Sequence, residues 1–432
     1  MNACHRLCYL PLVIAIAAAS TSMASPVLPL ASQWTGAQST GLTLEQAVSL
    51  AIERAPQLQA DSAATESAQA QLVSAGRLPD PELVLGVDNL PATGEDAGSF
   101  GRDFMTMRKV GVMQTFPNGR KLASQRERAA AVVAVAQSRS LQTRQETAQA
   151  VAIAWIDLQA AGLVQQKLQQ LQPEIELQAE AARTALANGR GSTLDALTAR
   201  SAVSDLEDRL IEADREVRLR RAELARWIGE DAARPLAPMP ALRELPVARE
   251  KLLASLHQHA SLLAFDAQRA LAQSEIDLAR AEKRPDWSAE LAYAKRGAAF
   301  SDMVSLEFRV GLPLFGGNRQ DPMIRAKRAE LSELEARREA ELRMHKSEVV
   351  AVLAAWDAAR ERIALYERER LPLARERSQT ALAGFRAGRV ELTQVLASHV
   401  DEIEVQRSYA ELVRQLGQAW VFLRYLQNEE LP

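Results

Sequence analysis

Apolar and polar residues alternate along four short segments of the chain. In the last segment every even position from Val304 to Leu314 is apolar, whereas Ser305, Glu307 and Arg309 occupy odd positions. A period of two predicts β-strands with one apolar face and one charged face. The second segment alternates less cleanly than the other three. The expected strands span residues 82–90, 104–116, 287–296 and 303–314.

Strands of about 10 residues with one apolar face fit transmembrane β-strands in length and pattern. On this interpretation Leu306, Phe308 and Val310 face lipid. Trp287 and Tyr293 would mark the two aromatic girdles of a membrane barrel. The alternative is a small half-buried sheet in a soluble domain, which shows the same alternation.

The rest of the chain carries apolar residues at three- and four-residue spacing with dense charge between them, which predicts helices. At 1.5 Å per residue the two longest would each reach about 100 Å, so they must pack lengthwise as coiled coils. Pro173 and Pro372 should each kink or restart their helix. The expected helical stretches include residues 58–76, 119–187, 261–283 and 320–385.

The two halves of the chain resemble each other in the order of these elements. Pro173 stands 16 residues before Gly189, and Pro372 stands 16 residues before Gly388. This shared spacing predicts a tandem duplication. The predicted organisation is a signal peptide at 1–24, a first repeat at 25–228 with a hairpin turn at 188–193, a linker at 229–246, and a second repeat at 247–432 with a hairpin turn at 386–391.

The N-terminus has the pattern of a cleaved secretory signal. Arg6 precedes an apolar stretch from Leu10 to Ala19, and small residues allow a cut after Ala24. Cleavage would remove Cys4 and Cys8, the only cysteines, and would exclude disulfides, thiolate metal sites and a cysteine nucleophile. We therefore expect an exported protein without a lipid anchor; a retained membrane anchor is the alternative.

Composition and motifs narrow the function. Lys and Arg number 52 against 55 Asp and Glu, for a net charge of −3, which argues against a nucleic-acid partner. Hydrophobic residues make up 47% of the chain, so wholesale disorder is excluded. The sequence has no phosphate loop, nucleophile elbow, HExxH or dinucleotide motif. We expect neither an enzyme nor a bound cofactor.

The sequence predicts no metal site. Met105, Met107 and Met113 are expected to share a strand face, where thioethers could bind Cu(I), but ordinary apolar cover is the preferred interpretation. The histidines of the expected mature chain show no ligand spacing, and two of them are interpreted as isolated, His345 and His399. The other two, His257 and His259, would point away from each other on a helix.

Four strands cannot close a barrel, and open sheet edges are not tolerated in lipid. Three copies of the chain would supply twelve strands, within the range of outer-membrane barrels. The sequence therefore predicts a homotrimer, with helical hairpins forming a second tube beneath the strands.

The repeat, the strand-pair positions and the turns at Gly189 and Gly388 resemble the TolC family of outer-membrane efflux ducts. The stretches 81–89 and 102–117 resemble its CzcC/CusC-like heavy-metal branch. The resemblance implies a mainly α fold with a small β part, and a trimeric twelve-stranded β-barrel on an α-helical barrel. It also implies a passive duct for heavy-metal cations in the cell outer membrane, with a long periplasmic part. Its partners would be outer-membrane lipid, a periplasmic adaptor and an inner-membrane pump.

The same resemblance implies a periplasmic gate at the hairpin turns. The family's acidic position falls on Asp195 and its aromatic position on Phe385. Its basic position falls on Val390, with Arg389 beside it as a substitute, and Asp195 would pair with Arg389 of the same or a neighbouring protomer. The alternative role of Asp195 is to cap a helix. Two further acidic positions of the family are Gln394 and Ala397 here.

The competing function is a periplasmic coiled-coil adaptor or scaffold, which also has long hairpins. Such a protein would lack lipid-facing strands and would carry a separate Gly-rich β domain, for which we find no sequence signal.

Overall fold

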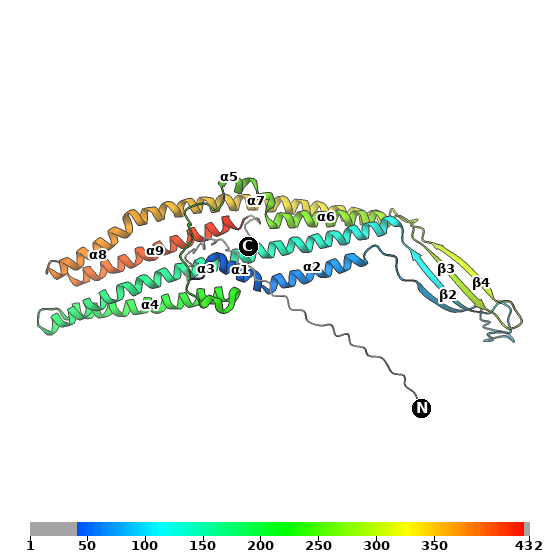
Figure 1. The fold of residues 1–432 in the computed structure, drawn as a ribbon, viewed down its shortest axis with the longest axis horizontal. Coiled ribbons are helices and arrows are strands. Elements are labelled where there is room, and N and C mark those ends of the chain that lie inside the picture. The colour runs from blue at the N-terminus through cyan, green and yellow to red at the C-terminus, as the bar shows by residue number, and fades with distance from the viewer. Residues whose placement is uncertain (1–40, 427–432) are drawn as a thin grey trace, which may run out of the picture. The chain divides into compact units, whose positions relative to one another are not determined.

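The computed structural model describes residues 41–426 (Figure 1), so the expected signal peptide and both cysteines lie outside the described residues. These residues are mainly helical, with one small sheet. The elements are α1 (Leu44–Arg54), α2 (Pro56–Ser74), β1 (Glu82–Asp88), β2 (Met107–Phe116), α3 (Gly119–Ala187), α4 (Thr193–Ile228), the 3-10 turn η1 (Gly229–Ala233), α5 (Arg249–Ala254), the 3-10 turn η2 (Leu256–Gln258), α6 (Ala260–Ala281), β3 (Trp287–Lys295), β4 (Met303–Val310), α7 (Gln320–Leu365), the π-helical turn η3 (Tyr366–Arg370), α8 (Leu371–Arg386) and α9 (Leu392–Arg424).

Polar side chains start the first helices. Thr43 and Gln46 form a reciprocal capping box on α1. Asn118 caps α3 by accepting a hydrogen bond from the Lys121 N–H at 2.9 Å. Ser192 caps α4 through the Leu194 N–H at 3.0 Å. Each cap satisfies a backbone donor that has no partner within its helix.

The two expected proline interruptions differ. Pro372 lies at the start of α8, directly after the π-helical turn η3, so the helix restarts there as predicted. Pro173 lies inside α3, which runs without a break from Gly119 to Ala187, so the helix does not restart at Pro173, and the other predicted effect, a kink, stays a prediction. A proline removes one backbone donor, and the packing of α3 against α4 and α9 maintains the helix on both sides of it.

The four strands form one antiparallel sheet in the order β1-β2-β3-β4. Their register aligns Leu85, Val110, Tyr293 and Val304 in one row across the sheet. Because side chains alternate along each strand, the next row toward the helices on that face, Leu83, Val112, Leu291 and Leu306, is apolar as well, whereas the row toward the loops carries Arg108 and Lys295. Within the described chain, β1 and β4 are the two edges of the sheet.

The strands are shorter than predicted at several ends. Strand β2 begins at Met107 rather than 104, because its partner β1 ends at Asp88 and Asn89 takes a positive φ of 56°. Strand β4 ends at Val310 rather than 314, because its last partner is Trp287, the first residue of β3. Beyond Val310 the alternation of apolar residues continues without a strand to pair with.

The largest hydrophobic core lies where α1, α3, α4, α7 and α9 meet the segment after η1. Two buried tryptophans hold this core through their indole N–H groups. Trp155 donates to the Leu42 carbonyl at 3.1 Å, and Trp356 donates to the Leu242 carbonyl at 3.0 Å. Because these carbonyls belong to irregular segments, the two bonds attach those segments to the long helices.

Helices α2, α3, α6 and α7 connect this core to the sheet, and the turns after α3 and α8 lie at the opposite end of the helices (Figure 1). Among the described helices, α3 is the one long and apolar enough to cross a membrane by hydropathy. However, 56% of its most apolar window is buried against other parts of the chain, as expected for a core helix.

Candidate functional site

One face of the sheet is apolar and exposed across all four strands. Its side chains are between 43% and 71% exposed, although each is large and apolar. An apolar surface this continuous needs a cover of matching chemistry. Its residues are Leu83, Leu85, Val87, Val110, Val112, Trp287, Leu291, Tyr293, Val304, Leu306, Phe308 and Val310.

The opposite face carries a network of charges. Glu290, which is only 4% exposed, pairs with Lys109 at 3.0 Å and with Arg309 at 2.9 Å. Arg309 also pairs with Glu307 at 2.7 Å. A buried charge needs a partner of opposite sign, so this network allows the face to carry charged residues although Glu290 is buried.

Aromatic residues lie at both ends of the apolar face. At the helix end, Phe116 stacks on Trp287 with ring centroids 4.2 Å apart, and Phe308 lies 6.4 Å from Trp287. At the loop end, the Tyr293 hydroxyl donates a hydrogen bond to Asp302. Trp287 and Tyr293 therefore lie at opposite ends of the apolar face, as two aromatic girdles of a membrane barrel would require.

A carboxylate joins the sheet to the helices. Asp286, just before β3, accepts hydrogen bonds from the Asn118 N–H at 2.8 Å and from the Lys121 ammonium at 2.7 Å. Burial alone would raise the pKa of Asp286, but the bonds from Lys121 and Asn118 outweigh it and hold the pKa below its usual value. Sequence reasoning missed this role, because Asp286 lies far along the chain from Asn118 and Lys121 and no local pattern indicates their contact.

The two hairpin turns share one geometry. Gly189 and Gly388 have φ values of 66° and 69°, which favour glycine. After each glycine, the next N–H donates to a carbonyl five residues earlier at 2.9 Å: Arg190 to Ala185, and Arg389 to Gly384. This is the Schellman arrangement, which ends one helix and reverses the chain into the next.

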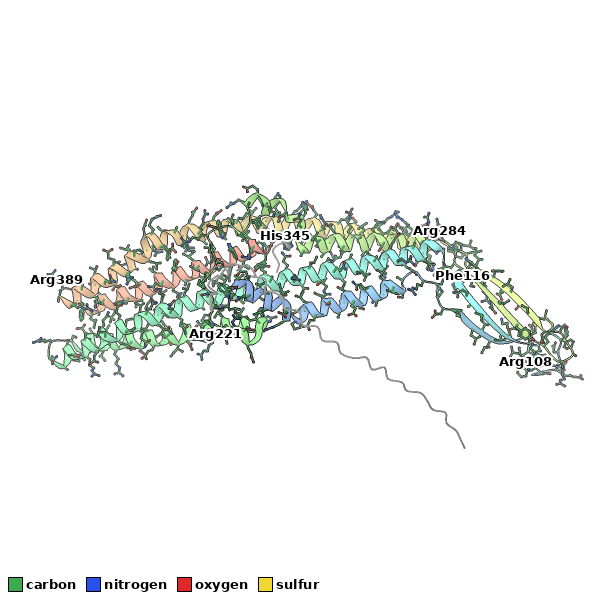
Figure 2. The ribbon with its side chains drawn as sticks, viewed as in Figure 1. Arg108, Phe116, Arg221, Arg284, His345 and Arg389 are labelled. Atoms are coloured by element: carbon green, nitrogen blue, oxygen red, sulfur yellow. The ribbon has the colours of Figure 1, made fainter. Side chains whose placement is uncertain are left out.

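The residues expected at the gate lie close to these turns. Asp195 is half-buried in the first turn of α4, where Ser192 rather than Asp195 provides the cap. Arg389 is exposed at the second turn, and Figure 2 shows it at the tip of the α8–α9 hairpin. Phe385 is half-buried against a small cluster that includes Ala199 and Leu392. Within the described part of one protomer Asp195 and Arg389 form no ion pair, so the pairing between neighbouring protomers stays a prediction.

Two predictions about possible metal ligands are corrected. Met105 lies outside β2, so the three methionines do not share one strand face; Met113 lies on the charged face, with its sulfur 3.1 Å from the Arg309 guanidinium. His345 is not isolated, because its ring centroid lies 4.2 Å from that of His259. No group of three or more His, Cys, Asp or Glu able to hold a metal occurs among residues 41–426.

His259, at the start of α6, contacts His345 in the middle part of α7. The Ser261 hydroxyl lies 2.9 Å from His259 Nδ1 and 2.8 Å from His345 Nε2, and Glu341 lies 3.1 Å from His345 Nε2. Burial, with a smaller contribution from His345, lowers the pKa of His259 to about 4. No sequence signal could have found this contact, because it joins residues 86 positions apart on different helices.

A groove of about 640 Å³ lies between α3, α4 and α9. One of its lining residues, Asp157, is 7% exposed, accepts a hydrogen bond from Gln418 at 2.8 Å and faces Arg220 and Arg414. Burial raises the pKa of Asp157, and the amide and the two guanidinium groups only partly offset it. The groove therefore combines an apolar base with charged walls of both signs.

Solved structures of outer-membrane channels share this fold. The outer membrane protein VceC of Vibrio cholerae is 19% identical, with a TM-score of 0.73 over 89% of this chain and 97% of that chain. The CmeC channel of Campylobacter jejuni is 11% identical, with a TM-score of 0.74 over 90% and 87% of the two chains. CusC is 16% identical, with a TM-score of 0.65 over 94% and 99%. At these identities the comparison establishes the fold, which is that of TolC-like channels, and does not single out a heavy-metal branch.

Sequence comparison gives the family. The outer membrane efflux protein family matches residues 47–230 and again residues 253–429, which together make up most of the chain. The chain therefore belongs to the outer membrane efflux protein family, and the outer membrane is its location. No curated protein matches the chain. Family membership favours a duct over the alternative of a periplasmic adaptor.

Proposed function

We propose that the protein is a passive, trimeric outer-membrane duct of a tripartite efflux system, exporting heavy-metal cations from the periplasm. The observation that carries this proposal is the exposed apolar face on all four strands, set against a charged face on the other side. Such a sheet suits a wall between lipid and water. We further propose that the two halves arose by tandem duplication, since the family matches the chain twice.

The edges of the sheet support the trimer. Among residues 41–426, strands β1 and β4 each have one side without a partner strand, and lipid does not tolerate unpaired backbone groups. Pairing β4 of one protomer with β1 of the next, three times over, satisfies both edges and closes a barrel of twelve strands.

The groove between α3, α4 and α9 supports a helical partner. Its base is apolar and its walls carry Arg209, Arg407, Glu212 and Glu216. An amphipathic helix with charges of both signs fits such a groove. We assign it to the hairpin of a periplasmic adaptor that connects the duct to an inner-membrane pump.

The charged face of the sheet supports a cationic cargo. By the strand register this face carries four carboxylates per protomer against two cations, Lys109 and Arg309. Rings of Asp and Glu favour cations in channels, and a weak excess does not hold the cargo too tightly. The carboxylates are Glu82, Asp88, Glu290 and Glu307.

The gate belongs to the same proposal. In the trimer, Asp195 of one protomer would approach Arg389 of the next at the hairpin tips. A partly exposed pair contributes only about 0–1 kcal/mol, but three pairs could still bias a closed state. Phe385 would support the closed state by packing the tip of the second hairpin.

Single-channel recording in planar bilayers tests the duct and its gate. Wild-type protein should give discrete conductance steps with a reversal potential of cation-preferring sign, and Glu307→Gln should reduce that preference. The double variant Asp195→Ala with Arg389→Ala should conduct several times more than wild type, and Phe385→Ala should add to the increase.

The matched control for the gate removes another exposed pair on the hairpins, Glu180 and Arg183, which lie 3.5 Å apart on α3. Replacing both with Ala should leave conductance unchanged. Wild-type conductance in an intact trimer of the Asp195/Arg389 variant would reject the gate. Absence of any conductance would reject the duct.

A further inference from the structure

Two like charges lie side by side at the loop end of the apolar face. Arg108 on β2 is directly opposite Lys295 on β3, and both side chains are exposed. By strand alternation Arg108 shares its face with Val110, and Lys295 shares its face with Tyr293. Like charges opposite each other in a sheet repel, which destabilises the sheet. An anion bound between Arg108 and Lys295 would remove this repulsion.

Neighbouring cations are paired, and Arg108 is not. Lys109 pairs with Glu290, Arg102 with Asp96, and the Arg296 guanidinium donates to the Ser301 carbonyl at 2.7 Å. Within residues 41–426, no carboxylate lies within ion-pair distance of Arg108 or Lys295. Asp302 acts on Lys295 only at longer range, and it already accepts hydrogen bonds from the Tyr293 hydroxyl and the Arg296 N–H.

The position of the pair along the sheet matches the depth of lipid headgroups. Figure 2 shows Phe116 at the helix end of the strands and Arg108 at the loop end. Eight residues along β2 separate them, which is about 26 Å of strand, or about 20 Å across the membrane at a tilt near 40°. If the aromatic residues at Phe116 mark the periplasmic boundary, the backbone of Arg108 and Lys295 lies about 5 Å short of the outer edge of a roughly 25 Å apolar band, a distance that their long side chains cover by extending toward the headgroups.

We propose that Arg108 and Lys295 bind the phosphate groups of anionic glycolipid in the outer leaflet. Arginine can donate two parallel hydrogen bonds to a phosphate, and lysine adds a compact charge beside it. The row below, which includes Val110 and Tyr293, would contact the acyl chains of the same lipid. This proposal rests on the proposed function, because it needs the apolar face in the outer membrane.

Native mass spectrometry of the purified trimer in non-ionic detergent tests the proposal. The probes are lipid A, its dephosphorylated form and inorganic phosphate. Wild type should bind lipid A at least about tenfold tighter than the dephosphorylated form, and millimolar inorganic phosphate should not abolish the difference. The variant Arg108→Gln with Lys295→Gln should lose the preference. Arg221→Gln with Arg362→Gln, an equal charge change on α4 and α7, should keep it.

Several results would overturn the proposal. Equal binding of both lipids to wild type would reject it whatever the variants do, and so would an unchanged preference in the Arg108/Lys295 double Gln variant. Full competition by inorganic phosphate would make the ligand a free ion. If the Gln variant fails to assemble, Arg108→Lys with Lys295→Arg decides, because it must retain the preference. The same spectra report the trimer, so its presence without lipid preference leaves the duct standing.

Discussion

Asp286 connects the start of α3 to the segment before β3 through one carboxylate. It receives hydrogen bonds from the start of α3 while it precedes β3, so it fixes the angle at which the sheet leaves the helices. Its sequence counterpart in the first half is Asp80, which also follows a proline but is exposed and makes no hydrogen bond or ion pair in the described chain.

Replacing Asp286 with Ala should destabilise the trimer by about 1–2 kcal/mol per protomer, because it leaves the Asn118 N–H and the Lys121 ammonium unpaired at a partly exposed site. The heat-induced dissociation midpoint of the trimer in detergent measures this loss. Asp80→Ala is the matched control and should leave the midpoint unchanged. Equal midpoints for the two variants would contradict the role of Asp286.

The lowered pKa of Asp286 also determines how its contribution to stability depends on pH. Since the pKa of Asp286 is lowered in the folded protein, its contribution is present above the unfolded value of 3.8 and is lost as pH falls through the lower folded value. The contribution of Asp286 therefore stays constant near neutral pH, whereas that of His259 does not.

His259 lowers stability in the same direction, as pH falls, but already at mild acidity. Its pKa is about 4 in the folded protein against 6.5 in the unfolded chain, so the unfolded chain binds more protons between these values. Stability should therefore fall as pH drops from about 6.5 toward 4. Ser261, His345 and Glu341 surround the ring, and only the uncharged form of His259 fits the buried contact with His345.

We expect the dissociation midpoint of wild-type trimer to fall between pH 7.5 and pH 5.0, and the fall to be smaller in His259→Gln. His257→Gln, an exposed neighbour on η2, serves as the control and should follow wild type. The same pH dependence in all three proteins would show that His259 does not cause it.

At the scale of elements, the strand faces give the sharpest test. Leu306→Arg should impair membrane assembly, since Arg on a lipid-facing strand costs about 2–4 kcal/mol near the midplane. Ser305→Arg makes the same change one residue away on the charged face, so it should assemble normally. Heat-resistant trimer in outer-membrane fractions measures both. If the two variants assemble equally well, the assigned faces are wrong.

Sequence patterns predicted elements best where local chemistry defines their ends. The bounds of α3 were predicted to the residue, because Asn118 caps its start and Gly189 allows the turn after it. The start of β2 and the end of β4 were missed, because the sequence pattern extends beyond the residues that have a partner strand. The helix does not restart at Pro173, because long-range packing maintains a helix that local rules would allow to end there.

The π-helical turn before Pro372 was predicted only as an interruption. Its form depends on Tyr366, which is buried and accepts a hydrogen bond from Arg370 at 2.8 Å. The contacts of His259 and Asp286 also depend on helices meeting in three dimensions. Interaction between distant residues of this kind leaves no periodic signal in one sequence.

At the scale of the whole molecule, the central claim is that three chains share one barrel. Within residues 41–426, the protomer has an exposed apolar face that suits lipid and two sheet edges without a partner strand, and such edges are not stable in lipid. The gate, the cation preference and the lipid site all require the closed assembly, since each depends on faces that the trimer defines.

Native mass spectrometry of the mature protein, extracted from outer membranes in mild detergent, tests this claim most directly. The account predicts a complex of three protomers that persists at low protein concentration, because the β4–β1 pairings close the barrel. A stable monomer that is fully inserted in bilayers would contradict it.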